Sequence, residues 1–419
     1  MFLEKAVPES ARNAYRRDAW AGLLAGIYGG TIGPFLLFIA RSQLHASESL
    51  IGLMAAGPFI GSMLALVYAN SMEGRRKMPY VVWPLIIGRT LFVLTLFAVT
   101  PLPFALVVTA AQILGALIGP GYAVVMKEIY PDDQRGTIMS YIRIGIAAAT
   151  FVTTLLVGPL LKGGHIPLLN IQVDPVSYKL IFPLGGLIGV ASAIAFGSIK
   201  TAPVDPVHPD NQRVPIFHFL RDTLGILRED KGYLWFSLSI AIGGFGNLMV
   251  VPIYPLYQVD TLHITAVQVS ILASITTIFW MFFYPYWGRY VDARCPIKAS
   301  VINTLLVILV PLNYFMATNV WMLIPSAIIL GISAGGTELA YFNSIMFFSK
   351  DGMEARYQAL HSFLLGLRGT IAPFCGAALA AYFRTNGLGV RYIFLIAMVL
   401  LMVGCGLQAY SLRFSRGRV

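Results

Sequence analysis

Two ionisable side chains lie deep inside long apolar stretches of the sequence, where a charge is most costly. Glu338 lies eleven residues before Ser349, and Arg368 lies twelve residues after Arg356. At about 1.5 Å of rise per helical residue, both would lie roughly 16–18 Å from the polar ends of their helices. A charge at such a depth in a bilayer costs at least a few kcal/mol, so each of the two residues needs an explanation.

The matching depth of Glu338 and Arg368 on consecutive stretches makes an ion pair between them sterically feasible. We hypothesise that Glu338 carries a coupling proton. Arg368 would bind an anionic group of a solute, or keep the acid ionised until a solute competes for it. The alternative is a permanent pair that only orients two helices. The functional reading is favoured because Glu338 is the only acid at mid-depth in an apolar stretch.

Arg143 is a second candidate for a basic wall of a solute site. It would lie about one helical turn closer to the cytoplasmic side than Arg368. The alternative is a pair with Glu128 or Asp132 at the inner end of the apolar region.

Aromatic and amide side chains on other stretches complete the expected solute site. Tyrosine and tryptophan combine an apolar ring with a polar tip, which suits a cavity that grips and releases an organic solute. The candidates are Tyr28, Thr31, Gln112, Asn247, Tyr254, Tyr257, Gln258, Thr276 and Trp280. Ordinary packing between helices is the alternative role for each of them.

These side chains must be positioned by membrane helices, because the composition excludes a soluble protein. Of the 419 residues, 57% are hydrophobic and 12% are charged, whereas soluble domains carry about 25% charged residues. The mean hydropathy of +0.73 excludes intrinsic disorder as well. Three widely spaced cysteines, Cys295, Cys375 and Cys405, exclude a disulfide framework and a CxxC metal site.

Twelve stretches are long enough to cross a hydrocarbon core, which takes about 20 apolar residues. They cover residues 19–40, 47–69, 79–100, 102–127, 136–161, 178–199, 233–258, 265–290, 298–318, 320–348, 356–383 and 389–411. The polar segment before the first stretch has no apolar core followed by a cleavage site. We therefore expect no removable signal peptide. In the seventh stretch, Pro252 and Pro255 predict a break in the helix.

The distribution of Lys and Arg predicts the orientation. If the N-terminus is cytoplasmic, 22 of the 30 basic residues lie on the cytoplasmic side and five lie on the opposite side. Both termini are therefore expected in the cytoplasm of a multi-pass protein of the cell membrane. Topology and anionic lipid headgroups account for the net charge of +11, which gives no reason to expect a nucleic-acid partner.

A polar segment over residues 200–232 separates two sets of six stretches. Its first part is rich in proline, and its second part, from Pro215 to Asp230, has apolar residues at helical spacing. The second part predicts an amphipathic helix at the membrane interface. The expected organisation is an N-terminal six-helix bundle over 1–199, a cytoplasmic linker over 200–232, and a C-terminal six-helix bundle over 233–419.

The two sets of stretches resemble each other. A shift of 221 residues aligns Pro34 with Pro255 and Arg135 with Arg356. Repeated six-helix units form a transporter architecture in which the solute site lies near mid-membrane.

Two loops carry related patterns of charge. One ends as Ser71-Met72-Glu73-Gly74-Arg75-Arg76-Lys77, and the other reads Gly288-Arg289-Tyr290-Val291-Asp292-Ala293-Arg294. The first has the basic cluster without the aspartate, and the second has the glycine and aspartate with a reduced basic tail. Together they resemble the G-x-L-x-D-R-x-G-R-K loop of the major facilitator superfamily.

This resemblance implies an all-α polytopic membrane protein with 12 transmembrane helices in two pseudo-symmetric six-helix bundles. It also implies that the two loops stabilise the outward-facing state through a helix N-terminus or an acid–base contact. The gating residues would be Gly74, Arg75, Arg76, Gly288, Asp292 and Arg294. A simple positive anchor is the alternative for the basic cluster. The third stretch would be peripheral, so Arg89 is expected to have a structural or snorkelling role.

The fifth stretch resembles the glycine–proline motif of exporters in this superfamily. It contains Gly145 and Gly158-Pro159, although Thr154 replaces an expected glycine and the spacing has one extra residue. Glycines and a proline permit a kink and a close approach of helices. This feature favours export, and ordinary packing is the alternative.

These observations predict a secondary active transporter that moves a small organic solute by alternating access, with proton-coupled efflux as the favoured mode. Uptake or facilitated diffusion of an organic anion or sugar is the alternative. A non-transporting receptor or assembly factor on the same fold is the alternative from another class. The expected partners are the solute, protons and membrane lipids, and the protein is expected to be a monomer without a cofactor.

An enzyme is not expected, because no HExxH, GxSxG or P-loop motif is present. The six histidines fall in loops or near the ends of stretches, without the spacing of metal ligands. They are His45, His165, His208, His218, His263 and His361.

Overall fold

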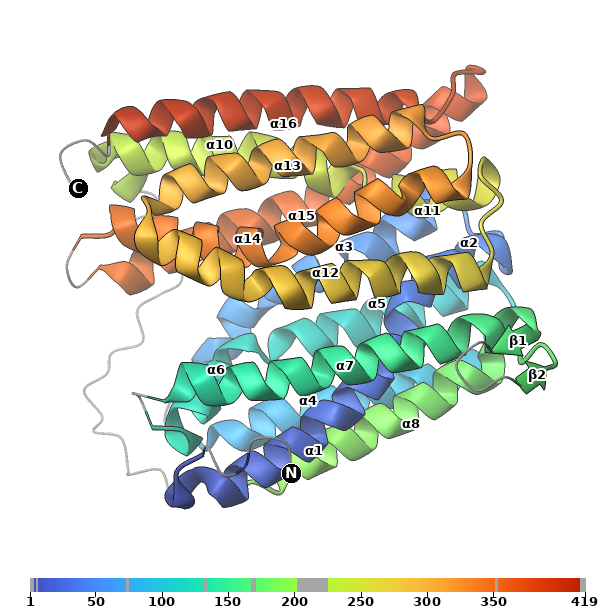
Figure 1. The fold of residues 1–419 in the computed structure, drawn as a ribbon, viewed down its shortest axis with the longest axis horizontal. Coiled ribbons are helices and arrows are strands. Elements are labelled where there is room, and N and C mark those ends of the chain that lie inside the picture. The colour runs from blue at the N-terminus through green and yellow to red at the C-terminus, as the bar shows by residue number, and fades with distance from the viewer. Residues whose placement is uncertain are drawn as a thin grey trace. The chain divides into compact units, whose positions relative to one another are not determined.

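The long apolar stretches fold into helices in the computed structural model. It describes residues 4, 7–72, 75–131, 134–166, 171–201, 225–350 and 353–414. The chain divides into two units (Figure 1). The first comprises Met1–Gln212 with Thr265–Ser274, and the second comprises Arg213–Ile264 with Ile275–Val419.

The first unit contains the six spans expected for the N-terminal half. They are α1 (Glu9–Ile32) with α2 (Leu36–Ser42), α3 (Glu48–Ser71), α4 (Lys77–Thr90) with a 3₁₀ segment (Leu91–Leu96), α5 (Pro101–Leu117) with α6 (Gly119–Ile129), α7 (Arg135–Lys162) and α8 (Tyr178–Gly197). Between α7 and α8, the strands β1 (Gly164–Ile166) and β2 (Ile171–Val173) pair antiparallel.

The second unit carries the remaining spans. They are α10 (Lys231–Met249) with α11 (Ile253–Asp260), α12 (Ala266–Ala293), α13 (Pro296–Met316), a 3₁₀ segment (Val320–Leu323) with α14 (Ile324–Phe348), α15 (Glu354–Thr385), and α16 (Tyr392–Ser411) with a 3₁₀ segment (Leu412–Phe414). The first residues of α12, up to Ser274, belong to the first unit.

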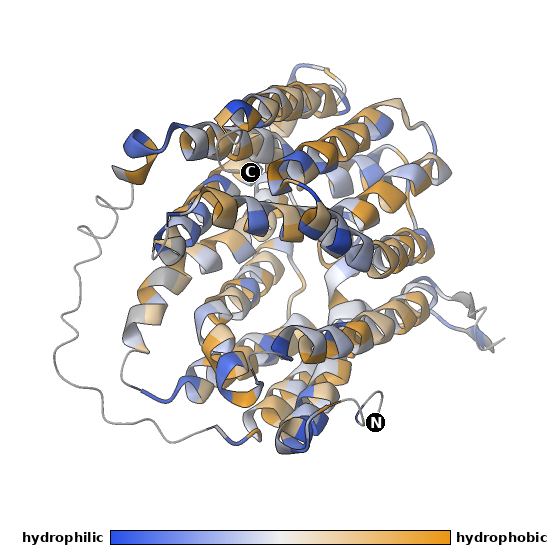
Figure 2. Ribbon diagram, turned by 60° about the vertical axis from the view of Figure 1, so that its left-hand side comes forward, coloured by the Kyte–Doolittle hydropathy of each residue, from blue (hydrophilic) through white to orange (hydrophobic). Residues whose placement is uncertain are grey.

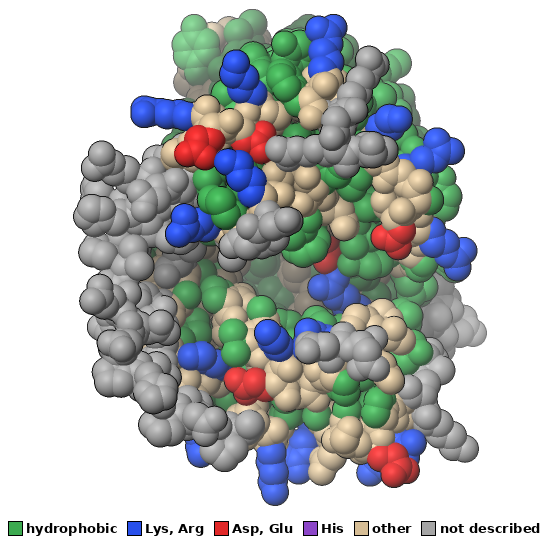
Figure 3. Space-filling view, turned by 90° about the vertical axis from the view of Figure 1, so that its left-hand side faces the viewer, with side chains coloured by type: hydrophobic (Ala, Val, Ile, Leu, Met, Phe, Trp, Pro, Cys, Tyr) green, Lys and Arg blue, Asp and Glu red, His purple; other side chains and the backbone are tan. Residues whose placement is uncertain are grey.

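Twelve helical spans in the described part of the chain are long and apolar enough to cross a membrane. Each corresponds to one of the twelve predicted stretches, so the predicted polytopic all-α fold is confirmed. Apolar residues follow the helices and hydrophilic residues gather at their ends (Figure 2). On the face seen in Figure 3, side chains of Lys and Arg lie at many places, together with some of Asp and Glu.

Particular residues set where helices begin, break and end. The Asp230 carboxylate caps α10 by accepting a hydrogen bond of 2.9 Å from the backbone N–H of Tyr233. The predicted break in the seventh span lies between α10 and α11, next to Pro252. Helix α7 ends where Gly163 adopts a φ of 76°, a conformation that favours glycine.

The start of the first span differs from the prediction. Helix α1 begins at Glu9 rather than near residue 19, so Asp18 lies inside the helix. Asp18 is buried, and the hydroxyl of Tyr130, at the end of α6, donates a hydrogen bond of 2.8 Å to its carboxylate. A contact across 112 residues satisfies this acid, and the local sequence does not reveal it.

The predicted amphipathic helix lies mostly outside the described residues. Within the range predicted for it, only residues 225–230 are described, and residues 225–229 are helical. Gly74 of the first signature loop also lies outside the described residues, together with Glu73.

Glycines bring helices of the second unit into close contact. A Cβ added to Gly404 of α16 would lie 2.6 Å from the Cα of Gly243 on α10. The backbones of the two helices are in contact here, so no side chain can move aside to make room for a methyl group. Close approach at small residues is a main source of helix–helix stability in lipid.

We expect Gly404→Ala to destabilise the protein by about 1–3 kcal/mol, because the added methyl overpacks this interface. Gly406→Ala on the same helix is the matched control, since its Cβ would meet nothing within 4 Å. Thermal unfolding of both purified variants in detergent measures the difference. If the two variants were equally stable, α10 and α16 could move apart with little loss of stability, and the prediction would be wrong.

Candidate functional site

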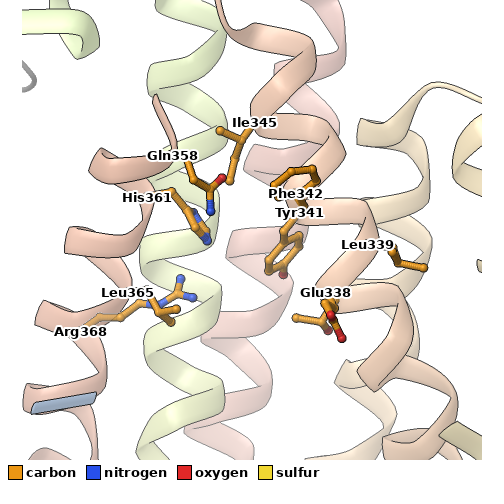
Figure 4. A pocket seen from close by; sticks show the side chains of 10 residues that line it. Glu338, Leu339, Tyr341, Phe342, Ile345, Gln358, His361, Leu365 and Arg368 are labelled. Carbon is orange, nitrogen blue, oxygen red and sulfur yellow. The ribbon is translucent and has the colours of Figure 1, made fainter. Parts of the chain in front are cut away.

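The second unit contains a cavity of about 420 Å³ between α14 and α15. Helix α14 contributes one wall and α15 contributes the other (Figure 4). The lining residues are Thr337, Glu338, Leu339, Tyr341, Phe342, Ile345, Gln358, His361, Leu365 and Arg368. The two intramembrane charges singled out in the sequence, Glu338 and Arg368, therefore line one cavity.

Arg368 enters the cavity wall from α15 and reaches toward α10. One of its terminal nitrogens, Nη1, donates a hydrogen bond to the carbonyl oxygen of Ile240 on α10. Its Nε is buried and has no hydrogen-bond partner. Gly244, one turn further along α10, leaves room for the guanidinium, because a Cβ at this position would overlap it. Among the described residues, no carboxylate forms an ion pair with Arg368.

Glu338 faces the cavity from the opposite wall. Its side chain is exposed, and its Oε1 accepts a hydrogen bond of 3.2 Å from the hydroxyl of Tyr284 on α12. The preceding residue, Thr337, is hydrogen-bonded at 2.8 Å to the amide of Asn303 on α13. Helices on both sides of α14 therefore fix the position of the acid.

The predicted proximity of Glu338 and Arg368 is found, but the ion pair considered in the sequence analysis is not formed. The guanidinium uses a backbone carbonyl of α10 as its acceptor. Gly244 explains this choice, since a larger residue there would close the space that the guanidinium occupies.

A smaller cavity of about 150 Å³ adjoins the first and shares Thr337, Tyr341, Leu365 and Arg368 with it. It extends between α10, α13 and α16. Its other lining residues are Ser239, Gly243, Gly244, Asn247, Leu248, Thr304, Val307, Leu401, Gly404 and Gln408. Asn247 thus has the cavity position expected of a solute-binding residue, whereas the Gln408 amide already accepts a 2.8 Å hydrogen bond from Thr304.

Sequence reasoning missed four polar residues of the larger cavity: Thr337, Tyr341, Gln358 and His361. Gln358 and His361 share one face of α15 with Leu365 and Arg368, at spacings of three, four and three residues. This stripe was the signal that could have identified them. The ring of His361 lies 6.4 Å from that of Tyr341, so α14 and α15 meet here through polar aromatic groups.

The other aromatic candidates of the second unit pack elsewhere. Tyr254 lies in an aromatic cluster, with ring centroids 4.5 Å from Tyr314 and 5.7 Å from Phe394. The ring centroid of Trp280 lies 5.5 Å from that of Tyr284, the tyrosine whose hydroxyl donates a hydrogen bond to Glu338. Neither side chain lines one of the two cavities.

In the first unit, Tyr28 packs inside the bundle. The guanidinium of Arg89 lies 5.0 Å from its ring centroid and donates a hydrogen bond of 2.5 Å to the carbonyl oxygen of Gly189. This arrangement supports the structural role expected for Arg89. The Oε1 of Gln112 is buried and lies next to Gly57 of α3. Arg143 is half-buried on α7.

Of the described gating candidates, Gly288 is half-buried and the four charged residues are exposed. Arg75 donates a hydrogen bond of 2.8 Å to the hydroxyl of Tyr80, and Arg76 is exposed just before α4. Asp292 and Arg294 are exposed at the end of α12, and a Cβ on Gly288 would meet nothing within 4 Å. No group of three or more His, Cys, Asp or Glu side chains within the described ranges could hold a metal ion.

Solved structures with a similar fold include several membrane transporters. A bacterial homolog to the human lysosomal transporter Spinster, in an inward-facing and unoccupied conformation, is 15% identical with a TM-score of 0.71, over 98% of each chain. A mutant form of the nucleoside transporter NupG is 15% identical with a TM-score of 0.71, over 95% of this chain and 100% of that one. A D-xylose-proton symporter is 12% identical with a TM-score of 0.68, over 95% and 97%.

Sequence comparison assigns the family. None of the curated proteins matches the chain. The family model described as Major Facilitator Superfamily matches residues 19–346 and residues 236–416, which together cover most of the chain. The resemblance noted in the loops is thereby confirmed, and the chain belongs to the Major Facilitator Superfamily of membrane transporters rather than to an enzyme family.

Proposed function

We propose that this protein exports a small organic solute with an anionic group, by alternating access and in exchange for protons. The observation that carries the proposal is the cavity of the second unit, where Glu338 and Arg368 face the same space. Arg368 has no carboxylate partner among the described residues, so an anionic solute would supply the charge that balances it. Export is further supported by Gly158 and Pro159 in α7.

Glu338 is the proposed carrier of the coupling proton. A carboxylate that is exposed to the cavity can exchange a proton with water whenever the cavity opens to one side of the membrane. Protonation removes a negative charge from a space that also contains the guanidinium of Arg368, and this changes the affinity for a charged solute. Solute and proton would be exchanged because a solute that fills the space beside Glu338 keeps a proton from reaching the carboxylate.

The remaining parts have roles in the same cycle. The bundles over residues 1–199 and 233–419 would move against each other, joined by the linker over 200–232, with both termini in the cytoplasm. Gly74, Arg75 and Arg76 in one loop, and Gly288, Asp292 and Arg294 in the other, would stabilise the outward-facing state.

We expect Glu338→Gln to abolish solute-dependent proton movement, because the amide cannot take up a proton. Proteoliposomes that contain a pH-sensitive dye would receive small organic acids and amino acids from outside, one at a time. Wild-type protein should change the internal pH with at least one of these solutes.

Glu229→Gln is the matched control, since Glu229 is exposed and pairs with Lys350 at 3.1 Å at the surface. It should leave proton movement unchanged. Proton movement at the wild-type rate in Glu338→Gln would exclude this residue as the coupling group.

A further inference from the structure

The smaller cavity of the second unit combines one charged side chain with several neutral polar ones. Among the described residues that line it, Arg368 carries the charge, and Asn247 on α10 and Gln408 on α16 provide carboxamide groups. We infer that the solute is a hydroxycarboxylate, with its carboxylate at Arg368 and a hydroxyl-bearing arm in the smaller cavity. This inference rests on the proposed function, which assigns an anionic group to Arg368, and it specifies the rest of the solute.

The carboxamide of Asn247 has no hydrogen-bond partner among the described residues. Its oxygen can therefore accept hydrogen bonds, and its nitrogen can donate two. The side chain is half-buried and lies within a membrane span. A polar group in such a place is unfavourable unless it is hydrogen-bonded, so Asn247 is expected to bind a polar group that enters the cavity.

The carboxamide of Gln408 is satisfied at one end only. The side chain is 2% exposed, and its oxygen accepts a hydrogen bond of 2.8 Å from the hydroxyl of Thr304. Its nitrogen donates to no described residue and has two N–H donors to offer. The hydroxyl of Ser239, also at the cavity wall, donates 2.6 Å to the carbonyl oxygen of Phe236, so its oxygen can still accept. The wall thus offers donors and acceptors together.

Hydroxyl groups match this wall better than the other common substituents of a carboxylic acid. A hydroxyl both donates and accepts, as the carboxamide of Asn247 does. An alkyl arm would leave the carboxamides without partners. An ammonium group would meet no acid among the described lining residues of the smaller cavity, and a second carboxylate would have to share the guanidinium of Arg368 with the first.

The volume of the smaller cavity limits the length of the arm. An apolar cavity of about 150 Å³ binds benzene, so the volume of about 150 Å³ found here has room for about six non-hydrogen atoms. Three carbons with three hydroxyl groups have this size. Because Arg368 lines both cavities, a carboxylate bound there would lie where the arm enters the smaller one. Any longer part of the solute would remain in the larger cavity.

A series of probes that differ only in their hydroxyl or carboxylate groups tests the inference on the full-length protein in detergent. Glycerate, threonate and gluconate are each compared with the alkanoate of the same chain length (propanoate, butanoate or hexanoate) and with the matching polyol (glycerol, threitol or glucitol). Isothermal titration should show at least one hydroxy acid that binds about tenfold or more tightly than both of its analogues. An alkanoate that binds as tightly as its hydroxy acid would overturn the inference, and so would the absence of binding by all three hydroxy acids.

Asn247→Ala tests one end of the site without narrowing the cavity. The advantage of the preferred hydroxy acid over its alkanoate should fall about fivefold or more, while the affinity for the alkanoate stays the same. Asn386→Ala is the matched control, because Asn386 is exposed just after α15 and donates to the carbonyl oxygen of Tyr382. It should retain the full advantage. If Asn247→Ala weakens the hydroxy acid and the alkanoate equally, Asn247 does not recognise hydroxyl groups and the assignment is wrong.

Gln408→Met tests the other end with a side chain of similar shape. The fold should survive, because the hydroxyl of Thr304 also lies 2.9 Å from the carbonyl oxygen of Ser300 and can donate there. The advantage of the hydroxy acid should again fall about fivefold or more. An undiminished advantage in a folded Gln408→Met protein would contradict the role of Gln408.

The proposed function can fail separately from this inference. If a hydroxy acid binds with the expected pattern but moves no protons in proteoliposomes, the hydroxycarboxylate site stands and proton-coupled transport does not. If an alkanoate drives proton movement as well as its hydroxy acid does, transport stands and the hydroxycarboxylate site does not.

Discussion

Replacing Arg368 with glutamine is expected to lower the affinity for a carboxylate solute by about 100-fold and to leave the fold intact. The loss is large because the guanidinium is a cation at the cavity wall and forms no ion pair with a carboxylate among the described residues. The fold should survive because the hydrogen bond that is lost joins Arg368 to a single backbone carbonyl, that of Ile240. Removing a buried cation that lacks a carboxylate partner also relieves its desolvation.

Isothermal titration with threonate and butanoate measures the affinity, and thermal unfolding measures the stability. Arg89→Gln is the matched control, because Arg89 is also an arginine inside a span that donates to a backbone carbonyl. Its guanidinium lies against the ring of Tyr28, and its loss should destabilise the first unit by about 1–2 kcal/mol without changing the affinity. An unchanged affinity in Arg368→Gln would assign that arginine to structure.

The twelve spans could be predicted from the sequence because membrane insertion is a local requirement. About 20 consecutive apolar residues satisfy it, whatever surrounds them. The positions at which the spans end depend less on the local sequence. The first helix takes in Asp18 because Tyr130, far away in the sequence, satisfies its carboxylate. The hairpin of β1 and β2 was not predicted either, because each of its two strands is only three residues long.

The candidate site was predictable in part. Each helical residue adds the same rise, so the depth of a residue can be counted from the polar end of its helix. Glu338 and Arg368 have similar depths by this count, and both line one cavity. The acceptor of the guanidinium was not predictable, because it depends on a space beside Gly244 in a helix more than 120 residues away. His361 was not predicted because it lies near the end of a span, where the local sequence does not distinguish a cavity residue from one at the polar interface.

Substituting Gly244 with alanine is expected to impair solute binding at least tenfold with little loss of stability. The added methyl would overlap the terminal atoms of the Arg368 side chain, which is flexible and can move away. The guanidinium would then lose the carbonyl oxygen of Ile240 and its place at the cavity wall. Because alanine is also the better helix former, the stability of α10 should change by less than about 1 kcal/mol.

The comparison with Gly404→Ala distinguishes a displaced Arg368 guanidinium from a disturbed packing of helices. Both variants add one methyl group to a helix of the second unit, but the methyl at residue 404 meets backbone and the methyl at residue 244 meets the end of a side chain. We therefore expect Gly404→Ala to lose stability and Gly244→Ala to lose affinity for threonate, as measured by thermal unfolding and titration. Wild-type affinity in Gly244→Ala would mean that solute binding does not depend on where the guanidinium lies. The charge of Arg368 would then act on the cavity from any nearby position, and the bond to Ile240 would serve only to join α15 to α10.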